Sequence, residues 1–202
     1  MVVDLCLKMS VLDQHKWNQR YTAGAYSNRP NASIFLQSCL TYHKYHNVLD
    51  LGCGLGRNAN FLSGISQHVD AIDISNKAIK KATMTHLDRS NIKWLCHDLD
   101  HCSSMQLESY DLFVFIRYLN RELLHQIINH MKPGSEIIIE QHLATKKAVA
   151  GPRSEDYKVQ PNEIYNLGKN LKCLFYQENI LIDPDDKKVA LIQCHYKKNK
   201  SR

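Results

Sequence analysis

The sequence predicts an α/β domain with a doubly wound, seven-stranded and mostly parallel sheet, a final antiparallel strand, and helices on both faces. Three observations support this fold. Short apolar runs alternate with stretches of helical periodicity, as in consecutive strand–helix–strand units. A cluster of glycines directly follows the first of these runs. Near the end of the chain, Asp183-Pro184-Asp185-Asp186 marks a turn between two strands, which we expect to form an antiparallel pair.

The predicted elements follow one another in the order that such a fold requires. Strands are expected at 47–51, 68–72, 92–96, 110–116 and 136–140, and then near 172–178 and 188–196. Helices are expected at 12–20, 31–44, 57–64, 76–87 and 120–131, with a short helix after Pro161. Ser75 is well placed to cap the helix at 76–87. Pro133 and Gly134 end the helix at 120–131. Right-handed crossovers then produce a largely parallel sheet.

Length, charge and cysteine content restrict the class of protein. The 202 residues fit a single domain. The net charge of +6 includes four basic residues within 197–202, which we expect to be a disordered tail, so the rest of the chain carries only +2. A basic stripe typical of nucleic-acid binding is therefore not expected. Seven scattered cysteines and the lack of a long apolar stretch favour a cytoplasmic protein with reduced thiols, either a monomer or a homodimer, and no membrane partner.

The glycine cluster is the clearest candidate binding feature. Gly52, Gly54 and Gly56 lie between the first strand of the sheet and the helix that follows it. Glycines at these positions let the backbone turn tightly and approach a ligand at the amino terminus of the helix. A tight turn without a ligand is the alternative interpretation. A dinucleotide-binding fingerprint requires glycine at the position of Arg57, and this difference argues against a nicotinamide cofactor.

Two acidic residues at strand ends extend the candidate site. Asp73 follows the second strand of the sheet, where an acid commonly accepts the ribose hydroxyls of an adenosine ligand. Asp98 follows the third strand, beside the same crevice, and is placed to accept the adenine amino group. Each acid by itself is also compatible with a helix cap or an exposed turn. Their positions after successive strands favour an adenosine-containing ligand.

The motifs together resemble those of class I S-adenosylmethionine-dependent methyltransferases, which have a Rossmann-like fold. The similarity spans about residues 12–196, and the ligand that it implies is S-adenosylmethionine. The segment Trp17-Asn18-Gln19-Arg20-Tyr21 is similar to the W-x-x-R-Y motif of the tellurite-resistance and thiopurine-type small-molecule methyltransferases. The other matching segments are Asp50-Leu51-Gly52-Cys53-Gly54-Leu55-Gly56, Asp73-Ile74-Ser75, Asp98-Leu99 and Met131-Lys132-Pro133-Gly134, although Ser135 stands where the family often has a second glycine.

The resemblance implies a role for each matching residue. The methionine portion of the cofactor would lie on the loop that follows Asp50, and Arg20 would pair with its carboxylate, unless Arg20 is simply a surface residue. Asp50 is also expected to be a cofactor-binding residue. The remaining cofactor contacts would be Gly52, Cys53 and Gly54 with the methionine portion, Asp73 and Ile74 with the ribose and adenine, Asp98 and Leu99 with the adenine edge, and Phe115 and Ile116 near the sulfur.

The residues around the acceptor carry less information than those around the cofactor. Methyl transfer requires alignment and exclusion of water more than a catalytic side chain, so we assign no catalytic residue. Tyr21, Arg117, Tyr118 and Arg153 are the candidate substrate contacts. The segment after the fourth strand lacks the Asn/Asp-Pro-Pro-Tyr/Phe motif of amide and RNA methyltransferases. We therefore expect a small-molecule methyltransferase, with an RNA- or protein-directed enzyme and a binding protein without turnover as alternatives.

Two further segments require an interpretation. Cys96, His97, His101 and Cys102 lie within seven residues, but neighbouring strand residues point to opposite faces, so we expect no metal site. Residues 1–46 are expected to form a helical lid over the methionine end of the cofactor. Within this lid, the aromatic side chains around Tyr21 would exclude water from the sulfonium and Gly24 would act as a hinge. Ordinary packing of these aromatic residues against the sheet edge is the alternative.

Overall fold

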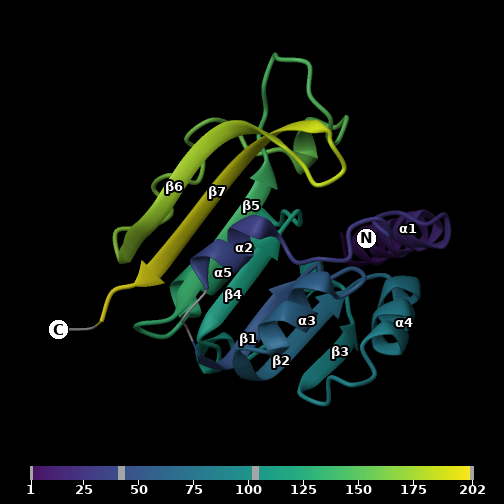
Figure 1. The fold of residues 1–202 in the computed structure, drawn as a ribbon, viewed down its shortest axis with the longest axis horizontal. Coiled ribbons are helices and arrows are strands. Elements are labelled where there is room, and N and C mark those ends of the chain that lie inside the picture. The colour runs from purple at the N-terminus through teal and green to yellow at the C-terminus, as the bar shows by residue number, and fades with distance from the viewer. Residues whose placement is uncertain (1, 41–43, 102–104, 201–202) are drawn as a thin grey trace.

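The computed structural model describes residues 2–40, 44–101 and 105–200, which form one seven-stranded sheet with helices around it (Figure 1). The strands are β1 (Tyr45–Leu51), β2 (Ser66–Asp73), β3 (Ile92–Cys96), β4 (Leu112–Ile116), β5 (Glu136–His142), β6 (Leu171–Ile182) and β7 (Lys188–Lys198). The helices are α1 (Val2–Thr22), α2 (Ile34–Cys39), α3 (Arg57–Ser63), α4 (Asn76–Thr85) and α5 (Arg121–His130), with short 3-10 turns at Leu99–His101, Leu107–Ser109 and Glu155–Tyr157.

The order of the strands confirms the predicted doubly wound sheet. The strands lie in the order β3-β2-β1-β4-β5-β7-β6. All pairs from β3 to β5 are parallel, whereas β7 runs antiparallel to both of its neighbours. The chain changes direction across the sheet between β1 and β4. In an open α/β sheet, ligands bind beside such a switch point, at the carboxyl ends of the strands.

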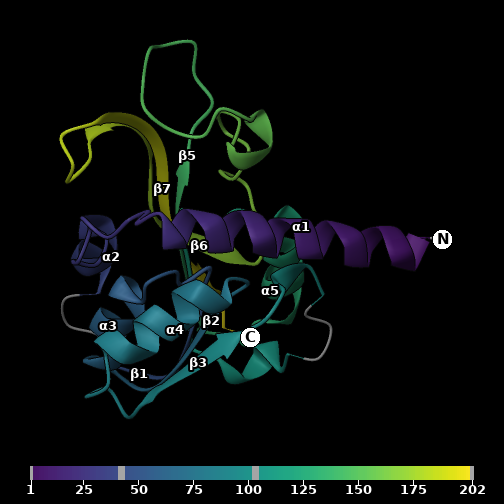
Figure 2. The ribbon, with the colours of Figure 1, turned by 90° about the vertical axis from the view of Figure 1, so that its right-hand side faces the viewer.

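Apolar side chains cover both faces of the sheet, which explains the continuous apolar runs in the sequence. All five residues of β4 are buried. Because side chains alternate along a strand, Val114 faces α2 and α3 while Phe113 faces α5. Figure 1 shows α2 and α3 in front of the strands, and Figure 2 shows α1 lying across the carboxyl ends with its amino-terminal part extending beyond the sheet. No helix within the described residues is long and apolar enough to span a membrane.

The helices after the first strand begin where the sequence predicts. Ser75 caps α4 by accepting a hydrogen bond from the amide of Ala78 at 3.1 Å, as expected. Asn120 caps α5 in the same way, through the amide of Leu123 at 2.8 Å. These caps fix the point at which each helix leaves the loop at the carboxyl end of its strand.

Three predictions about secondary structure are wrong. The helix expected at 31–44 is only α2, because Ser33 rather than Asn31 provides the cap and Leu40 ends the helix; residues 41–43 lie outside the described residues. The helix expected after Pro161 is a series of turns, because Asn162 adopts a left-handed φ of 62° and its amide donates to Glu178.

The third correction concerns the basic tail. Lys197 and Lys198 belong to β7 rather than to a disordered tail. The ammonium of Lys197 lies 2.8 Å from a carboxylate oxygen of Glu136, and that of Lys198 donates to the carbonyl oxygen of Ile128 at 2.6 Å. The two lysines thus form the end of β7, and their charges bind acceptors on the folded body.

Candidate functional site

The loop between β1 and α3 has a backbone that only glycine adopts readily. Gly52 and Gly54 have φ values of 69° and 56°, in the left-handed region. A Cβ atom on Gly52 would lie 2.5 Å from Cβ of Tyr118, and one on Gly54 would lie 2.7 Å from the hydroxyl oxygen of Tyr21. Two aromatic side chains therefore rest directly on the loop, and the glycines are required by these contacts as well as by the turn.

Asp73, at the end of β2, holds this loop in place. Its Oδ2 accepts a hydrogen bond from the amide of Gly54 at 2.9 Å, and its Oδ1 accepts one from the amide of Ser75 at 2.8 Å. Burial raises the pKa of the Asp73 carboxyl, while these two amides oppose that effect. An ionised carboxylate has about four acceptor sites, so Asp73 retains the capacity to bind a further donor on the side of the cavity that it lines.

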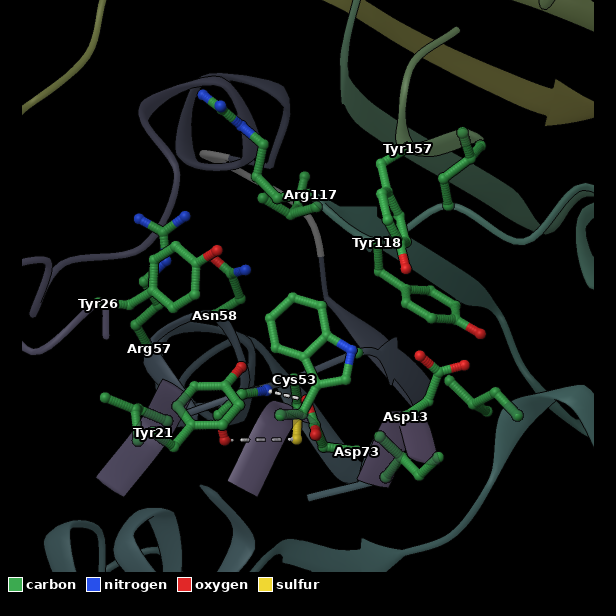
Figure 3. A pocket seen from close by; sticks show the side chains of 18 of the residues that line it. Asp13, Tyr21, Tyr26, Cys53, Arg57, Asn58, Asp73, Arg117, Tyr118 and Tyr157 are labelled. Carbon is green, nitrogen blue, oxygen red and sulfur yellow. Dashed lines mark hydrogen bonds between the residues drawn. The ribbon is translucent and has the colours of Figure 1, made fainter. Parts of the chain in front are cut away.

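A cavity of about 210 Å³ opens beside these residues, at the carboxyl ends of β1, β2 and β4 (Figure 3). In Figure 3, Arg57 and Tyr26 lie on one side of it and Tyr118 and Tyr157 on the other. Its lining includes eleven of the residues predicted from the sequence: Tyr21, Gly52, Cys53, Gly54, Asp73, Ile74, Asp98, Leu99, Ile116, Arg117 and Tyr118. Residues from separate segments of the chain thus meet at the expected switch point.

Four predicted site residues do not line the cavity. Asp50 is fully buried beneath the loop, where burial raises the pKa of its carboxyl to about 7. Phe115 belongs to the hydrophobic core on the α5 side, because it alternates with Ile116 along β4. Arg20 is exposed, with its guanidinium 4.7 Å from the ring centre of Trp17. Arg153 lies exposed in the loop after β5.

Ten further residues line the cavity without having been predicted as site residues. Trp17 and Tyr26, which belong to the predicted lid, line the cavity together with Tyr21. The lining residues that sequence reasoning missed are Asp13, Arg29, Leu55, Arg57, Asn58, Asp100, Leu119 and Tyr157. Arg57 and Asn58 directly follow the glycine loop, so their position in the motif was an available signal. Arg29 and Tyr157 come from irregular segments, where no pattern indicates which way a side chain points.

Comparison with known proteins identifies this architecture. Residues 48–134, from within β1 to the turn between α5 and β5, match the family described as "Methyltransferase domain". The chain is 30% identical over 141 residues to a probable S-adenosyl-L-methionine-dependent methyltransferase, TehB, from Haemophilus influenzae. Over these residues the chain resembles S-adenosylmethionine-dependent methyltransferases.

Solved structures of this methyltransferase fold agree with the topology. The crystal structure of TehB from Haemophilus influenzae matches with a TM-score of 0.70 and 23% identity, over 90% of this chain and 67% of that one. The N-methyltransferase NodS from Bradyrhizobium japonicum, in complex with S-adenosyl-L-homocysteine, matches with a TM-score of 0.63 and 18% identity, over 81% and 83% of the two chains. The TehB sequence match covers 66% of this chain but only 48% of TehB, so the chain spans about half the length of that curated relative.

Arg117 forms three side-chain hydrogen bonds at the edge of the candidate site. Its Nε donates to Glu140 at 3.2 Å, one terminal nitrogen donates to Asp183 at 2.7 Å, and the other donates to Nε2 of His142 at 3.1 Å. The residue also has a left-handed φ of 61°. All three guanidinium nitrogens are therefore engaged by the protein, and the ion pairs hold the end of β4 to β5 and to the β6–β7 turn.

Arg29 and Arg57 complete a group of three arginines at the edge of the cavity. Arg29 lies 3.0 Å from Asp183 and 2.9 Å from Asp185, so it connects the segment after α1 to the same turn. Arg57 donates to the carbonyl oxygen of Asn31 at 3.1 Å. Within the described residues, no carboxylate forms an ion pair with Arg57, and burial lowers the pKa of its guanidinium.

No metal centre is found in the described part of the chain. Within it, no group of three or more histidine, cysteine or acidic residues is arranged to hold a metal ion. Cys102, one of the four residues considered for zinc, lies outside the described residues.

Proposed function

We propose that this protein is an S-adenosylmethionine-dependent methyltransferase that acts on a small-molecule acceptor. The observation that carries the proposal is the convergence of a left-handed glycine loop with Asp73 and Asp98 at one cavity. Backbone without side chains leaves room for the methionine portion of a ligand, and the two acids supply acceptors for hydroxyl and amino groups. The family match supports the same cofactor.

The residues fit this cofactor along its length. Asp73 would accept the ribose hydroxyls, Asp98 and Leu99 would contact the adenine, and the loop from Gly52 to Gly54 would lie against the methionine portion. The aromatic faces of Trp17 and Tyr21 suit a sulfonium cation, which the π-systems of aromatic rings attract. Arg29 lines the same cavity, with its guanidinium 6.0 Å from the ring centre of Tyr26.

The bound cofactor would supply an electrophilic methyl group. A lone pair of the acceptor would form the new bond to the methyl carbon, while the electron pair of the carbon–sulfur bond would remain on sulfur and leave S-adenosylhomocysteine. The side chains of this protein have to align the acceptor and keep water away. Tyr21 is 6% exposed, and Tyr118 rests on Gly52, so aromatic rings occupy the position from which water would otherwise reach the loop. We assign no general base.

Two observations support a small acceptor. The described residues form a single sheet. The first basic residues of the carboxyl-terminal tail are bound to the folded body. We also expect a cytoplasmic protein, because Cys39, Cys53, Cys96, Cys173 and Cys194 are free thiols, and we expect it to be a monomer or a homodimer.

Calorimetry with S-adenosylhomocysteine tests the cofactor assignment. We expect binding by the unmodified protein, and Asp73→Ala should weaken it by about 1.5–3 kcal/mol for each hydrogen bond lost to the carboxylate. Asp88→Ala, an exposed acid whose side chain is 74% accessible, is the matched control and should bind normally. Unchanged affinity in Asp73→Ala would remove this residue from the site.

Turnover is tested separately from binding. The protein is incubated with isotopically labelled S-adenosylmethionine and a metabolite extract, and mass spectrometry then detects compounds that carry the labelled methyl group. Labelled small molecules are expected. Label recovered only in RNA or protein would contradict the proposed class of acceptor, and cofactor binding without any labelled product would favour a binding protein.

A further inference from the structure

A second cavity, of about 360 Å³, lies on the face of the sheet that α2 partly covers, between α2 and strands β6 and β7. Its volume falls within the range of about 300–1,000 Å³ that is typical of small-molecule sites. Three arginines, Arg29, Arg57 and Arg117, line both this cavity and the one at the glycine loop. The two cavities therefore meet at these side chains.

The outer wall of the second cavity is apolar and exposed. Phe35 on α2 and Phe175 on β6 face each other with ring centres 5.3 Å apart. Phe175 is 40% exposed, and the neighbouring wall residues Ile34 and Ile182 are 71% and 65% exposed. Because α2 has only six residues, it leaves this part of the sheet uncovered. Large apolar side chains gathered around a cavity in this way are typical of a surface that binds an apolar group.

The floor of the cavity is polar, buried and internally bonded. Glu140 and Gln193, from neighbouring strands, are 5% and 6% exposed. Gln193 donates to Glu140 at 2.6 Å, and the hydroxyl of Ser33 donates to the same oxygen at 3.2 Å. Arg117 pairs with the other oxygen of Glu140 at 3.2 Å. The negative charge of the floor is thus already balanced, and this network holds the floor rigid.

The charge that remains for a ligand is that of Arg57. Arg29 and Arg117 are both paired with carboxylates. Arg57 bonds to one backbone carbonyl, so most of its five N–H donors stay free for a ligand. A planar guanidinium binds a carboxylate through two parallel hydrogen bonds, which makes an acidic group the best complement to this junction.

We propose that the second cavity is the acceptor site, and that the acceptor is a small carboxylic acid with an apolar body about the size of an aromatic ring system. The apolar body packs against the exposed side of Phe175 and the neighbouring wall residues Ile34 and Ile182, and the carboxylate binds Arg57 where the two cavities meet. This inference rests on the proposed function, because the junction brings the acceptor to the cavity that we assign to the cofactor.

Three probes with one ring system and different charges test the site: naphthoate, naphthalenemethanol and naphthylmethylammonium. Each is titrated by calorimetry into the intact chain, alone and saturated with S-adenosylhomocysteine. Naphthoate should bind at least about tenfold more tightly than the neutral alcohol, because its carboxylate forms charge-assisted hydrogen bonds. The ammonium probe should bind most weakly, and saturation with S-adenosylhomocysteine should leave naphthoate binding intact.

Two pairs of variants locate the probe. Phe175→Ala should weaken naphthoate binding about tenfold through the loss of apolar contact. Leu174→Ala is its control, because Leu174 is similarly exposed, at 43%, but does not line the cavity. Arg57→Gln should abolish the preference for naphthoate over the alcohol, whereas Arg89→Gln, an exposed arginine beyond α4, should retain it.

The outcomes separate this inference from the proposed function. Competition between naphthoate and S-adenosylhomocysteine would put the probe in the cofactor cavity and overturn the inference, as would equal binding of all three probes. Phe175→Ala could instead change the molecular mass of the protein in solution without changing naphthoate binding. That result would make this face an interface between copies of the chain, and it would also overturn the inference. If naphthoate binds as expected but S-adenosylhomocysteine does not bind at all, the proposed function fails while the second cavity remains a site for acids.

Discussion

The two halves of the sheet form their parts of the site in different ways. At β1 and β2, the contacts are local: the carboxylate of Asp73 binds the amide of Gly54, 19 residues away. Beyond β4, the contacts are distant: Arg29 reaches Asp185 across 156 residues of sequence, and Arg117 reaches Asp183 across 66. The first half thus relies on backbone shape, whereas the second relies on ion pairs between long side chains. Each half should therefore respond to a different kind of substitution.

The largest effect is expected from a methyl group on the glycine loop. Gly52→Ala places Cβ 2.5 Å from Tyr118 at a φ of 69°, so overpacking adds to backbone strain, for a total of about 2–5 kcal/mol of lost stability. The affinity for S-adenosylhomocysteine should fall with it. Urea denaturation and calorimetry measure the two effects.

Gly134→Ala is the control for backbone strain alone. This residue has a φ of 86°, but a Cβ atom there would have no neighbour within 4 Å. We expect a loss of about 1–2 kcal/mol and normal binding of S-adenosylhomocysteine. If Gly52→Ala and Gly134→Ala lose equal amounts of stability, then backbone strain alone, and not the packing of Tyr118, explains the need for glycine at position 52.

The distant half should be most sensitive at Arg117. Arg117→Gln removes two ion pairs from a side chain that is only 14% exposed and leaves Glu140 and Asp183 without this partner, which should cost about 3 kcal/mol. Arg121→Gln breaks the pair with Glu163 at a side chain that is 43% exposed and should cost at most about 1 kcal/mol. Similar losses, measured by urea denaturation, would contradict a structural role for Arg117.

The same difference explains what the sequence could and could not predict. The sheet, its switch point and the glycine loop were predictable, because both hydrophobic periodicity and the glycines of left-handed turns can be recognised from residues that are close in sequence. The role of Arg117 was not predictable. Its position in the sequence indicated a substrate contact, but in the structure its three guanidinium nitrogens bind Glu140, His142 and Asp183. Only the tertiary fold brings those partners together, so no local pattern could reveal them.

Helix boundaries show the same limit. The helix expected at 31–44 shortens to α2 because the chain has to enter β1 at Tyr45, whose backbone amide bonds to the carbonyl oxygen of Ile65. The helical turn expected after Pro161 is replaced because the amide of Asn162 bonds to Glu178 on β6. In both cases tertiary contacts override the local preference.

A pH dependence of stability should come from the distant half as well. Burial first, and then the positive charge of Arg117, lower the pKa of His142 from 6.5 to about 4. Arg29 and Lys158 lower it further, whereas Asp183 raises it. Arg117 can only donate, so Nε2 of His142 accepts the hydrogen bond and the ring is neutral.

The sign follows from this neutral ring. Between pH 6.5 and about pH 4 the unfolded chain binds a proton at His142 that the folded chain does not, so the contribution of His142 to stability falls as the pH falls through this window, by at most about 3 kcal/mol. Asp50, whose pKa is raised to about 7, acts in the opposite direction, so the effect of His142 is read as the difference between the unmodified protein and a His142 variant. Glu136, whose pKa is lowered to about 2, adds to the loss only toward the acidic end. His142→Gln, which still accepts from Arg117, should flatten the slope between pH 6.5 and about pH 5 in urea denaturation. An unchanged slope would contradict the assignment.

The smallest predicted effect concerns residues 12–28, the segment that lies over the cavity. The cofactor cavity, at about 210 Å³, is smaller than the roughly 300 Å³ at the lower end of small-molecule sites, and Tyr21 fills part of it by resting on Gly54. We therefore propose that residues 12–28 move to admit the cofactor and close again over it. Amide hydrogen exchange should show these residues gaining protection when S-adenosylhomocysteine binds. Protection confined to 50–56 and 73–74 would leave the segment as ordinary packing.

Arg20 distinguishes two forms of this closure. In the structure its guanidinium stacks on Trp17 and donates to the hydroxyl of Tyr26 at 3.3 Å, outside the cavity. If the closed segment has this arrangement, Arg20→Gln loses only an exposed cation–π contact of about 0.5–1 kcal/mol, and the affinity for S-adenosylhomocysteine falls by less than about fivefold. If Arg20 instead turns inward to the cofactor carboxylate, as the sequence suggested, the loss of a charge-assisted pair should exceed about tenfold. We expect the smaller loss, because Arg20 does not line the cavity and its guanidinium already stacks on Trp17.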